Sequence, residues 1–443
     1  MKQARNKDGF GLWRLAWPIG VELLLQFLMG TVDTLMVSRI GDDAVSAVGV
    51  SNQVIQTAMT LFAVINAGAG AVIARMWGAR QWDKARGTAA IAIQVNLLFG
   101  VAGGLIFAFL SPFVLRAMGV PSAVQEYGIS YLSAVGGGIV VITLHLVVNA
   151  LIRNIGNTVG PMLITVGMNV IHLILNYLLI FGIGFLPELG VHGTAISTLV
   201  SRLIALAAAF MLLQRLLSPG MTRRSWLRTD RGLLRDIVGI GLPVSVTAMS
   251  WGFSQIVLLS IVSSFGAHAL ASFTYVQTIQ QFPWMIASAI GSALGIQVGQ
   301  WHGAGRREQV HRAPVRAILV GTALVLGASV AIRLWAHPIV GVFTREEGIA
   351  ALAIPMLALS IVWQPLRVTA FCLSNSLNIV GGARAVAVLS VVGMWFISTG
   401  GAYLFGSVFG WGLQGVLAAM IVDEAVRGAY FLRRWRRREP QRA

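Results

Sequence analysis

The sequence is poor in charged residues and holds a single cysteine. Only 11% of its 443 residues are charged, whereas soluble domains have about 25%. This shortage excludes a soluble enzyme and a disordered chain, and one cysteine excludes a secreted domain held together by disulfides. Apolar residues make up 56% of the chain. The composition is typical of a protein that crosses a membrane many times.

Sequence motifs for ATP hydrolysis and for zinc proteolysis are also missing. The GxxxxGK[ST] phosphate loop does not occur, and neither does HExxH. We therefore expect that the protein is not an enzyme and that it holds no cofactor and no metal, apart from H⁺ or Na⁺ as a coupling ion. The 33 basic residues, against 16 acidic ones, flank the apolar runs. That distribution is typical of cytoplasmic loops and lipid-headgroup contacts rather than of nucleic-acid binding.

Apolar runs long enough to cross a bilayer, which takes roughly 20 residues, predict twelve helical spans. The strong bias of arginine to one set of connections places both termini in the cytoplasm, and we expect a bacterial inner-membrane protein. The runs lie near 12–38, 46–74, 88–115, 128–152, 160–186, 193–214, 236–264, 269–299, 314–336, 349–373, 384–406 and 411–432.

An internal repeat divides the chain into halves. At an offset of 225 residues, Pro18 meets Pro243, and further matches are Gly41 with Gly266 and Gln56 with Gln281. We predict an all-α membrane protein of two six-helix bundles, related by a pseudo-twofold axis along the membrane normal. The lobes are 1–214 and 236–443, joined by a cytoplasmic linker at 215–235. Such repeats are typical of transporters that alternate their access.

Polar residues on the first span form one helix face. Glu22, Gln26 and Asp33 are spaced i, i+4 and i+11. An ionisable group at membrane depth is costly, so it indicates function. We expect Asp33 to bind H⁺, or Na⁺ in its ionised form. The alternative is that Asp33 is solvated at the outer interface beside Arg39.

A second polar face lies on the fifth span. Its residues are spaced i, i+4, i+7 and i+11, and they are Thr165, Asn169, His172 and Asn176. The amides can hydrogen-bond a protonated Asp33 or coordinate a cation. The alternative is helix–helix packing through buried amides. Three residues of these spans are candidates for the substrate cavity. They are His172 on the fifth span and Thr198 and Arg202 on the sixth.

The second half carries fewer charges. The repeat counterpart of Asp33 is Leu258, so any ion-coupling site belongs to the first lobe. Gln281, Trp363 and Arg367 are candidates for a substrate cavity, although Arg367 could instead reach toward an interface. In the last span Asp423 lies one turn from Arg427, which favours a structural ion pair.

Several motifs, in order along the whole chain, resemble those of multidrug and toxic compound extrusion (MATE) transporters. They are Val32-Asp33-Thr34, Arg75 with Gly78-Ala79, the run from Arg153 to Thr158, Leu175-Asn176-Tyr177, and Gly241-Leu242-Pro243. The resemblance implies export of organic cations or other amphipathic compounds against inward H⁺ or Na⁺. It also implies that Asp33 is the ion site, with Asn169 and Asn176 as its neighbours.

The chain departs from the Na⁺-dependent branch of that family at two acids. Trp251 stands near the position of a seventh-span glutamate, and Arg367 near that of a tenth-span aspartate. The chain therefore looks closer to the branch named for the DNA-damage-inducible protein F, which favours H⁺ over Na⁺.

Two other functions remain open. A lipid-linked oligosaccharide or lipid flippase would share the two bundles, and Arg202 and Arg367 would suit its cationic cavity. A membrane-embedded lipid enzyme is disfavoured because no catalytic cluster of His, Asp and Cys is present. As partners we expect small amphipathic or cationic molecules and the lipid bilayer, and we expect a monomer.

Overall fold

The computed structural model describes residues 11–182, 187–217 and 230–438, the side chains of residues 61 and 63 excepted, and these ranges contain no strand. The helices before residue 218 are α1 (Leu12–Val37), α2 (Asp42–Gly78), α3 (Trp82–Ala117), α4 (Ser122–Tyr131), the π-helical η1 (Leu132–Gly136), α5 (Ile139–Asn154), α6 (Val159–Phe181) and α7 (Gly190–Leu217). Those after residue 229 are α9 (Arg231–Ser263), α10 (Ala267–Gly303), α11 (Arg307–Leu334), α12 (Ala336–Phe343), α13 (Glu347–Leu377), η2 (Asn378–Gly382), α14 (Ala383–Val392), η3 (Gly393–Thr399), α15 (Gly400–Ala402), η4 (Tyr403–Val408) and α16 (Gly412–Arg436).

These helices form twelve membrane spans. Eight described stretches are long and apolar enough to cross a membrane, or ten when each of two bent helix pairs counts as one span. One of the eight, Glu347–Val408, has 62 residues and at about 1.5 Å per residue is far longer than a bilayer is thick. It breaks at Gly381, where φ is +90°, and so makes two spans. The last span is α16, whose charged residues exclude it from a count based on apolar composition.

The chain folds as two compact units. One consists of residues 21–242 and the other of residues 243–443 together with 1–20. We call them the N-unit and the C-unit. Each contains six spans, but α1 and α9 pass from one unit to the other, at Gly20 and at Leu242. Most of the predicted linker, residues 218–229, lies outside the described residues; its described ends are the last turn of α7 and the first turn of α9.

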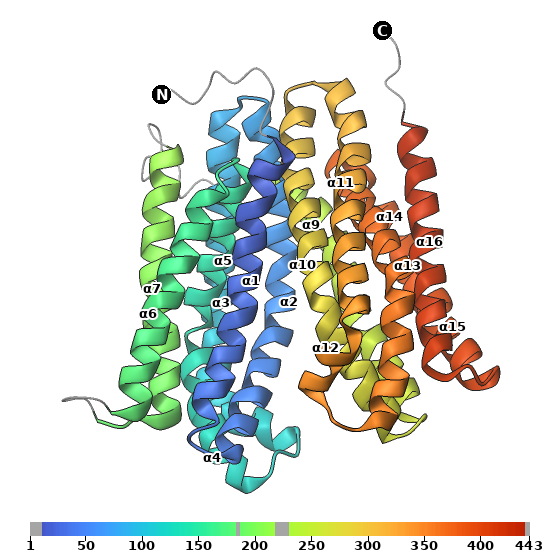
Figure 1. The fold of residues 1–443 in the computed structure, drawn as a ribbon. Helices are drawn as coiled ribbons and strands as arrows, with labels where there is room; N and C mark the ends of the chain where they lie inside the picture. The colour runs from blue at the N-terminus through green and yellow to red at the C-terminus, as the bar shows by residue number, and fades with distance from the viewer. Residues whose placement is uncertain (1–10, 183–186, 218–229, 439–443) are drawn as a thin grey trace. The chain divides into compact units, whose positions relative to one another are not determined.

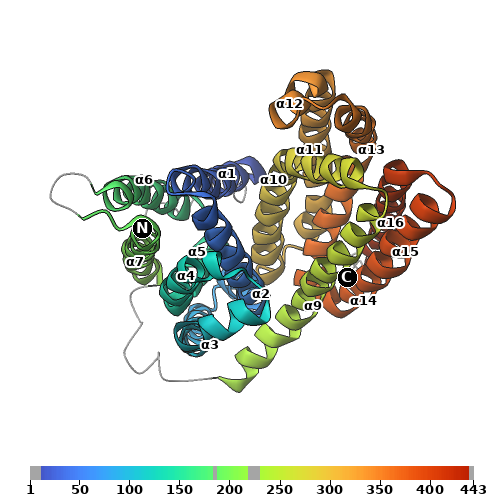
Figure 2. The same ribbon diagram turned by 90° about the horizontal axis from the view of Figure 1, so that it is seen from below.

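In the N-unit, small residues let helices approach closely. Figures 1 and 2 show α6 and α7 side by side along their length. A Cβ at Gly193 of α7 would lie 2.6 Å from the Leu179 carbonyl oxygen of α6. Apolar side chains of α2, α3, α5 and α7 form a buried core that also includes Leu233 and Ile237 of α9. The first turns of α9 are therefore held by the N-unit.

Two glycines bring α9 against α2. A Cβ at Gly241 would lie 1.9 Å from the Val64 carbonyl oxygen, and one at Gly68 would lie 2.0 Å from the Ile237 carbonyl oxygen. Backbone atoms cannot move aside as the end of a flexible side chain can. Both positions therefore require glycine, as close crossings of membrane helices commonly do.

We expect Gly241→Ala to destabilise the protein by about 1–3 kcal/mol, because the added methyl group overpacks the crossing. Gly239→Ala is the matched control, since a Cβ at that position of the same helix meets nothing within 4 Å. Better helix propensity should make this control neutral or slightly stabilising. Thermal unfolding in detergent, followed by loss of the monodisperse chromatographic peak, compares the two. Equal transition temperatures would contradict the close crossing.

In the C-unit, α10, α11, α13 and α16 pack around a core that runs from Leu258 to Met420. Figure 1 shows α13 and α16 as neighbours at the C-terminal end of the chain. Positive φ angles recur at the repeat offset: Gly41 and Gly266 precede α2 and α10, and Arg80 and Gly305 follow them. The repeated sequence thus specifies the same turns in both halves.

Candidate functional site

Five polar side chains from α1, α6 and α7 meet in the N-unit. We call Asp33, His172, Asn176, Ser197 and Thr198 the Asp33 cluster. Asn176 Nδ2 donates to Asp33 Oδ1 at 2.8 Å, and Asn176 Oδ1 accepts from the Ser197 hydroxyl. His172 Nδ1 lies 3.5 Å from Asp33 Oδ1. The side chain of His172 is 2% exposed and that of Asp33 is 20% exposed, so the carboxyl group is sheltered but reachable.

The hydrogen bonds of His172 link it to the protonation state of Asp33. Thr198 Oγ1 donates to the Thr194 carbonyl at 2.8 Å and lies 3.1 Å from His172 Nε2. With the hydroxyl proton used in this way, Nε2 carries a proton and donates to Thr198. Nδ1 then faces Asp33, where it can accept a hydrogen bond from a protonated carboxyl or carry a proton itself on a charged ring. A proton taken up at this position can therefore reside on either Asp33 or His172.

A half-buried arginine and a buried tyrosine lie near this cluster. The charges of Asp33 and Arg202 attract each other, although no ion pair within 4.0 Å forms between them. Tyr131, at the end of α4, donates to Asn52 Oδ1 at 3.3 Å and is within electrostatic range of Asp33. Sequence reasoning missed Tyr131 and Asn52, and no periodic pattern marked either. It also passed over Ser197, although neighbouring polar residues of α7 were apparent.

Every other acid within the predicted spans is paired with an arginine. Glu22 Oε1 accepts from Arg153 Nη1 at 2.6 Å. In α16, Asp423 and Glu424 both bind Arg427, at 2.7 and 2.9 Å, which confirms the predicted ion pair. Asp236 lies 4.0 Å from Arg75. Among these acids, Asp33 is the one that no described arginine bonds.

The predicted polar face of α1 is divided in the structure. The Glu22 side chain is 2% exposed and bonds Arg153 of α5, whereas Gln26 is exposed. Asn169 Nδ2 donates to the Leu25 carbonyl at 3.1 Å, so it ties α6 to α1 rather than contacting Asp33 directly. Of the ion-coupling candidates, the structure brings Asn176 alone into hydrogen-bonding contact with Asp33 within the described residues.

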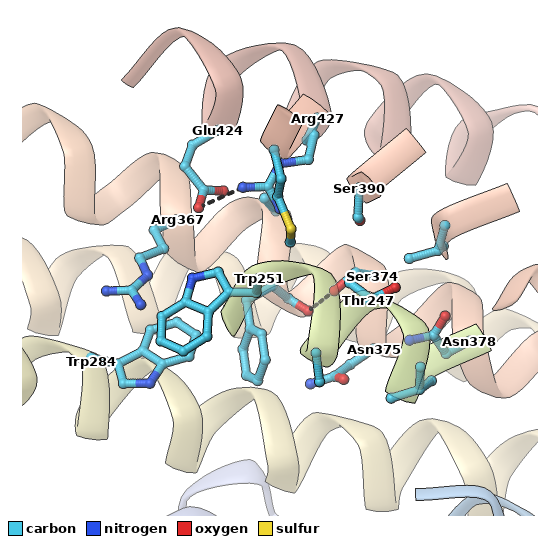
Figure 3. A pocket seen from close by; sticks show the side chains of 16 residues that line it. Thr247, Trp251, Trp284, Arg367, Ser374, Asn375, Asn378, Ser390, Glu424 and Arg427 are labelled. Atoms are coloured by element: carbon cyan, nitrogen blue, oxygen red, sulfur yellow. Dashed lines mark hydrogen bonds and ion pairs between the residues drawn. The ribbon is translucent and has the colours of Figure 1, made fainter. Parts of the chain in front are cut away.

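The C-unit contains a cavity of about 340 Å³, which we call the α13 cavity. That volume is at the lower end of the range for small-molecule sites. Figure 3 shows its polar and aromatic side chains, with Arg427 bonded to Glu424. The lining residues are Val244, Thr247, Ala248, Trp251, Trp284, Arg367, Ala370, Phe371, Ser374, Asn375, Asn378, Val386, Ser390, Met394, Glu424 and Arg427.

Of the cavity candidates from the second half, Arg367 lines the α13 cavity. Its guanidinium carbon lies 3.7 Å from the ring centroid of Trp284 and 5.1 Å from that of Trp363. Trp363 is 3% exposed. It contacts Arg367 but does not line the cavity. Gln281 is exposed and is not part of the lining. The buried neighbour Gln280 instead accepts a hydrogen bond from Gln364 at 2.7 Å.

A multi-pass membrane protein of twelve spans, with polar groups and a cavity at the depth of its spans, has the features of a secondary transporter. The MatE family profile matches residues 18–178 and again 243–404. The chain therefore belongs to the MatE family of transporters. The two matched ranges begin 225 residues apart, which is the offset of the internal repeat.

Known relatives cover nearly the whole chain. It is 31% identical over 438 residues to the "Uncharacterized transporter YisQ" of Bacillus subtilis, covering 99% of this chain and 96% of that one. It is 23% identical over 419 residues to the "Probable multidrug resistance protein NorM" of Thermotoga maritima, covering 93% and 89%. These similarities are to transporters rather than enzymes, and they do not favour a flippase.

Solved structures share the fold. A transporter of the MOP superfamily from Pyrococcus furiosus, described under the words "Reverse polarity of binding pocket suggests different function", matches with a TM-score of 0.87 and 25% identity over 96% of this chain and 95% of its own. A "multidrug resistance MATE family transporter" in an outward-facing conformation matches with a TM-score of 0.86 and 24% identity, covering 96% and 95%. The predicted all-α fold is confirmed.

Proposed function

We propose that this protein exports amphipathic small molecules, organic cations among them, against an inward flow of H⁺. Protonation of Asp33 biases the protein between two conformations, and a bound substrate biases the same two. Two ligands that shift one equilibrium are coupled even when they do not touch. Curated relatives named as multidrug resistance proteins support the substrate class.

One observation carries this proposal. Asp33 bonds Asn176 and faces His172, whereas Glu22, Asp423 and Glu424 each bond an arginine. An acid held in an ion pair stays charged, because its protonation would leave a buried arginine uncompensated. Asp33 bonds an amide instead, so its protonation breaks no arginine ion pair within 4.0 Å among the described residues.

The same surroundings favour H⁺ over Na⁺ at Asp33. A nitrogen ligand such as His172 suits Na⁺ poorly, since hard cations prefer oxygen, and the positive charge of Arg202 opposes a second cation. Trp251 and Arg367, where the Na⁺-dependent branch carries acids, agree with this. We therefore propose that the protein is closer to the branch named for the DNA-damage-inducible protein F.

The membrane context completes the proposal. We propose a monomer in the bacterial plasma membrane with both termini in the cytoplasm, because the arginine-rich connections lie on one side of the predicted spans. The two predicted lobes are the parts that move, and the predicted linker joins them. Neither a metal nor a cofactor has a part in this mechanism.

We expect a pH gradient alone to drive transport by the wild-type protein. In proteoliposomes carrying ethidium, a pH gradient should drive dye movement, and a Na⁺ gradient at constant pH should not. Protein-free vesicles and a protonophore are the controls. Transport driven by Na⁺ alone would refute H⁺ coupling.

A further inference from the structure

The guanidinium group of Arg367 contacts tryptophan rings but has no hydrogen-bond partner among the described residues. The guanidinium carbon lies 3.7 Å from the centroid of the Trp284 ring, and this cation–π contact satisfies no hydrogen-bonding capacity. The five N–H donors of the group therefore remain available. Because Arg367 lines the α13 cavity, a molecule in that cavity can reach them.

The two other charged side chains of the lining already engage each other. Glu424 bonds Arg427 at 2.9 Å, and Arg427 also bonds Asp423 at 2.7 Å. Glu424, the single acid of the lining, is therefore occupied. An organic cation entering the cavity would meet two arginines and find no unpaired carboxylate there.

We propose that the α13 cavity binds aromatic compounds that carry a carboxylate, with Arg367 as the anchor for the carboxylate. This inference rests on the proposed export function and specifies one substrate class for it. A carboxylate fits the edge of a guanidinium through two parallel hydrogen bonds. Trp284 keeps that edge in a fixed orientation, which reduces the entropy lost when the ligand binds.

The rest of the lining suits the aromatic part of such a compound. Trp251, Phe371 and Met394 provide apolar surface, and tryptophan and phenylalanine rings stack on aromatic ligands. Asn375 and Asn378 add amide groups that can bind further polar substituents. A cavity of about 340 Å³ accommodates a ligand of two or three fused rings.

Three probes of nearly equal shape test the proposal: 2-naphthoate, its methyl ester and 2-naphthylmethylammonium. In isothermal titration calorimetry with the full chain in detergent, 2-naphthoate should bind about tenfold or more tightly than the ester, the ratio expected for a charged hydrogen bond. The ammonium should bind most weakly. Wild-type protein that prefers the ammonium, or that does not bind 2-naphthoate, would overturn the proposal.

Arg367→Gln should lower the affinity for 2-naphthoate to that for the ester, and Arg367→Glu should reverse the preference toward the ammonium. Arg345→Gln is the matched control, because Arg345 is exposed just before the same helix. Folding is checked through Cys372, the single cysteine, which is buried in α13 and should stay unreactive to a maleimide. A folded Arg367→Gln variant with wild-type affinity, or a folded Arg367→Glu variant without the reversal, would overturn the assignment.

These titrations involve no ion gradient. If the α13 cavity fails to bind the carboxylate, the binding proposal is wrong, but the separate proposal of H⁺-driven transport still stands. If 2-naphthoate binds through Arg367 but a pH gradient drives no transport of ethidium or of 2-naphthoate itself, the coupling proposal fails and the binding site remains.

Discussion

Replacing Asp33 by asparagine should reduce pH-driven export to the level of protein-free vesicles. The amide is nearly the same size as the carboxyl and can still hydrogen-bond Asn176, so the fold should survive. It cannot take up a proton, however, and the gradient then loses its means of biasing the two conformations. Dye movement in proteoliposomes under a fixed pH gradient measures this loss directly.

The control for Asp33→Asn is Asp42→Asn, which makes the same chemical change at an exposed position at the start of α2. That variant should export at the wild-type rate. His172→Gln gives a further comparison, because it removes the ring that faces Asp33 and should shift the pH at which export is half-maximal. Full pH-driven export by Asp33→Asn would mean that coupling takes place elsewhere.

Removing Arg153 should destabilise the protein by about 3–5 kcal/mol, the cost of breaking a buried ion pair on one side. Glu22 is 2% exposed and bonds Arg153 at 2.6 Å, and its second oxygen has no partner among the described residues. Arg153→Gln leaves this carboxylate buried without its arginine. The loss of stability is measured by thermal unfolding of the purified wild-type and variant proteins in the same detergent.

The double variant Glu22→Gln with Arg153→Gln should recover most of that stability, since two neutral amides can hydrogen-bond each other. It also tests the other role considered for Glu22. If the double variant folds and exports with a pH gradient, Glu22 is structural. If it folds but does not export, Glu22 takes part in coupling together with Asp33.

The spans could be predicted because each is a long run of apolar residues. The repeat could be predicted because apolar and turn residues recur in the same order in both halves. The second predicted span, 46–74, is shorter than α2, which runs from Asp42 to Gly78. A span predicted from hydropathy ends where the apolar run meets polar residues. The helix itself continues further, because Asp42 and Asp43 in its first turn and Arg75 in its last turn complement the helix dipole.

The partners of the polar side chains could be predicted only in part. The pairing of Asp423 with Arg427 is local, one helical turn apart, and sequence spacing predicts it. Glu22 and Arg153 are 131 residues apart, and no spacing rule joins them. The stripe of Asn169 and Asn176 looked uniform in sequence, yet Asn169 bonds backbone and Asn176 bonds Asp33. The two amides share a face of α6 but lie about 10 Å apart along its axis, and Asn176 is the one level with Asp33.

The assignment of residues 12–20 to the C-unit has a consequence for biosynthesis. These residues leave the ribosome well before the second half of the chain, to which their partners belong; a Cβ at Gly20, for example, would lie 3.6 Å from Ala289 Cβ. At translation rates of about 5–20 residues per second, the start of α1 waits on the order of tens of seconds before its neighbours are inserted. The first half therefore cannot complete its packing alone, and a nascent chain arrested after α7 should expose the start of α1 to chaperones and proteases.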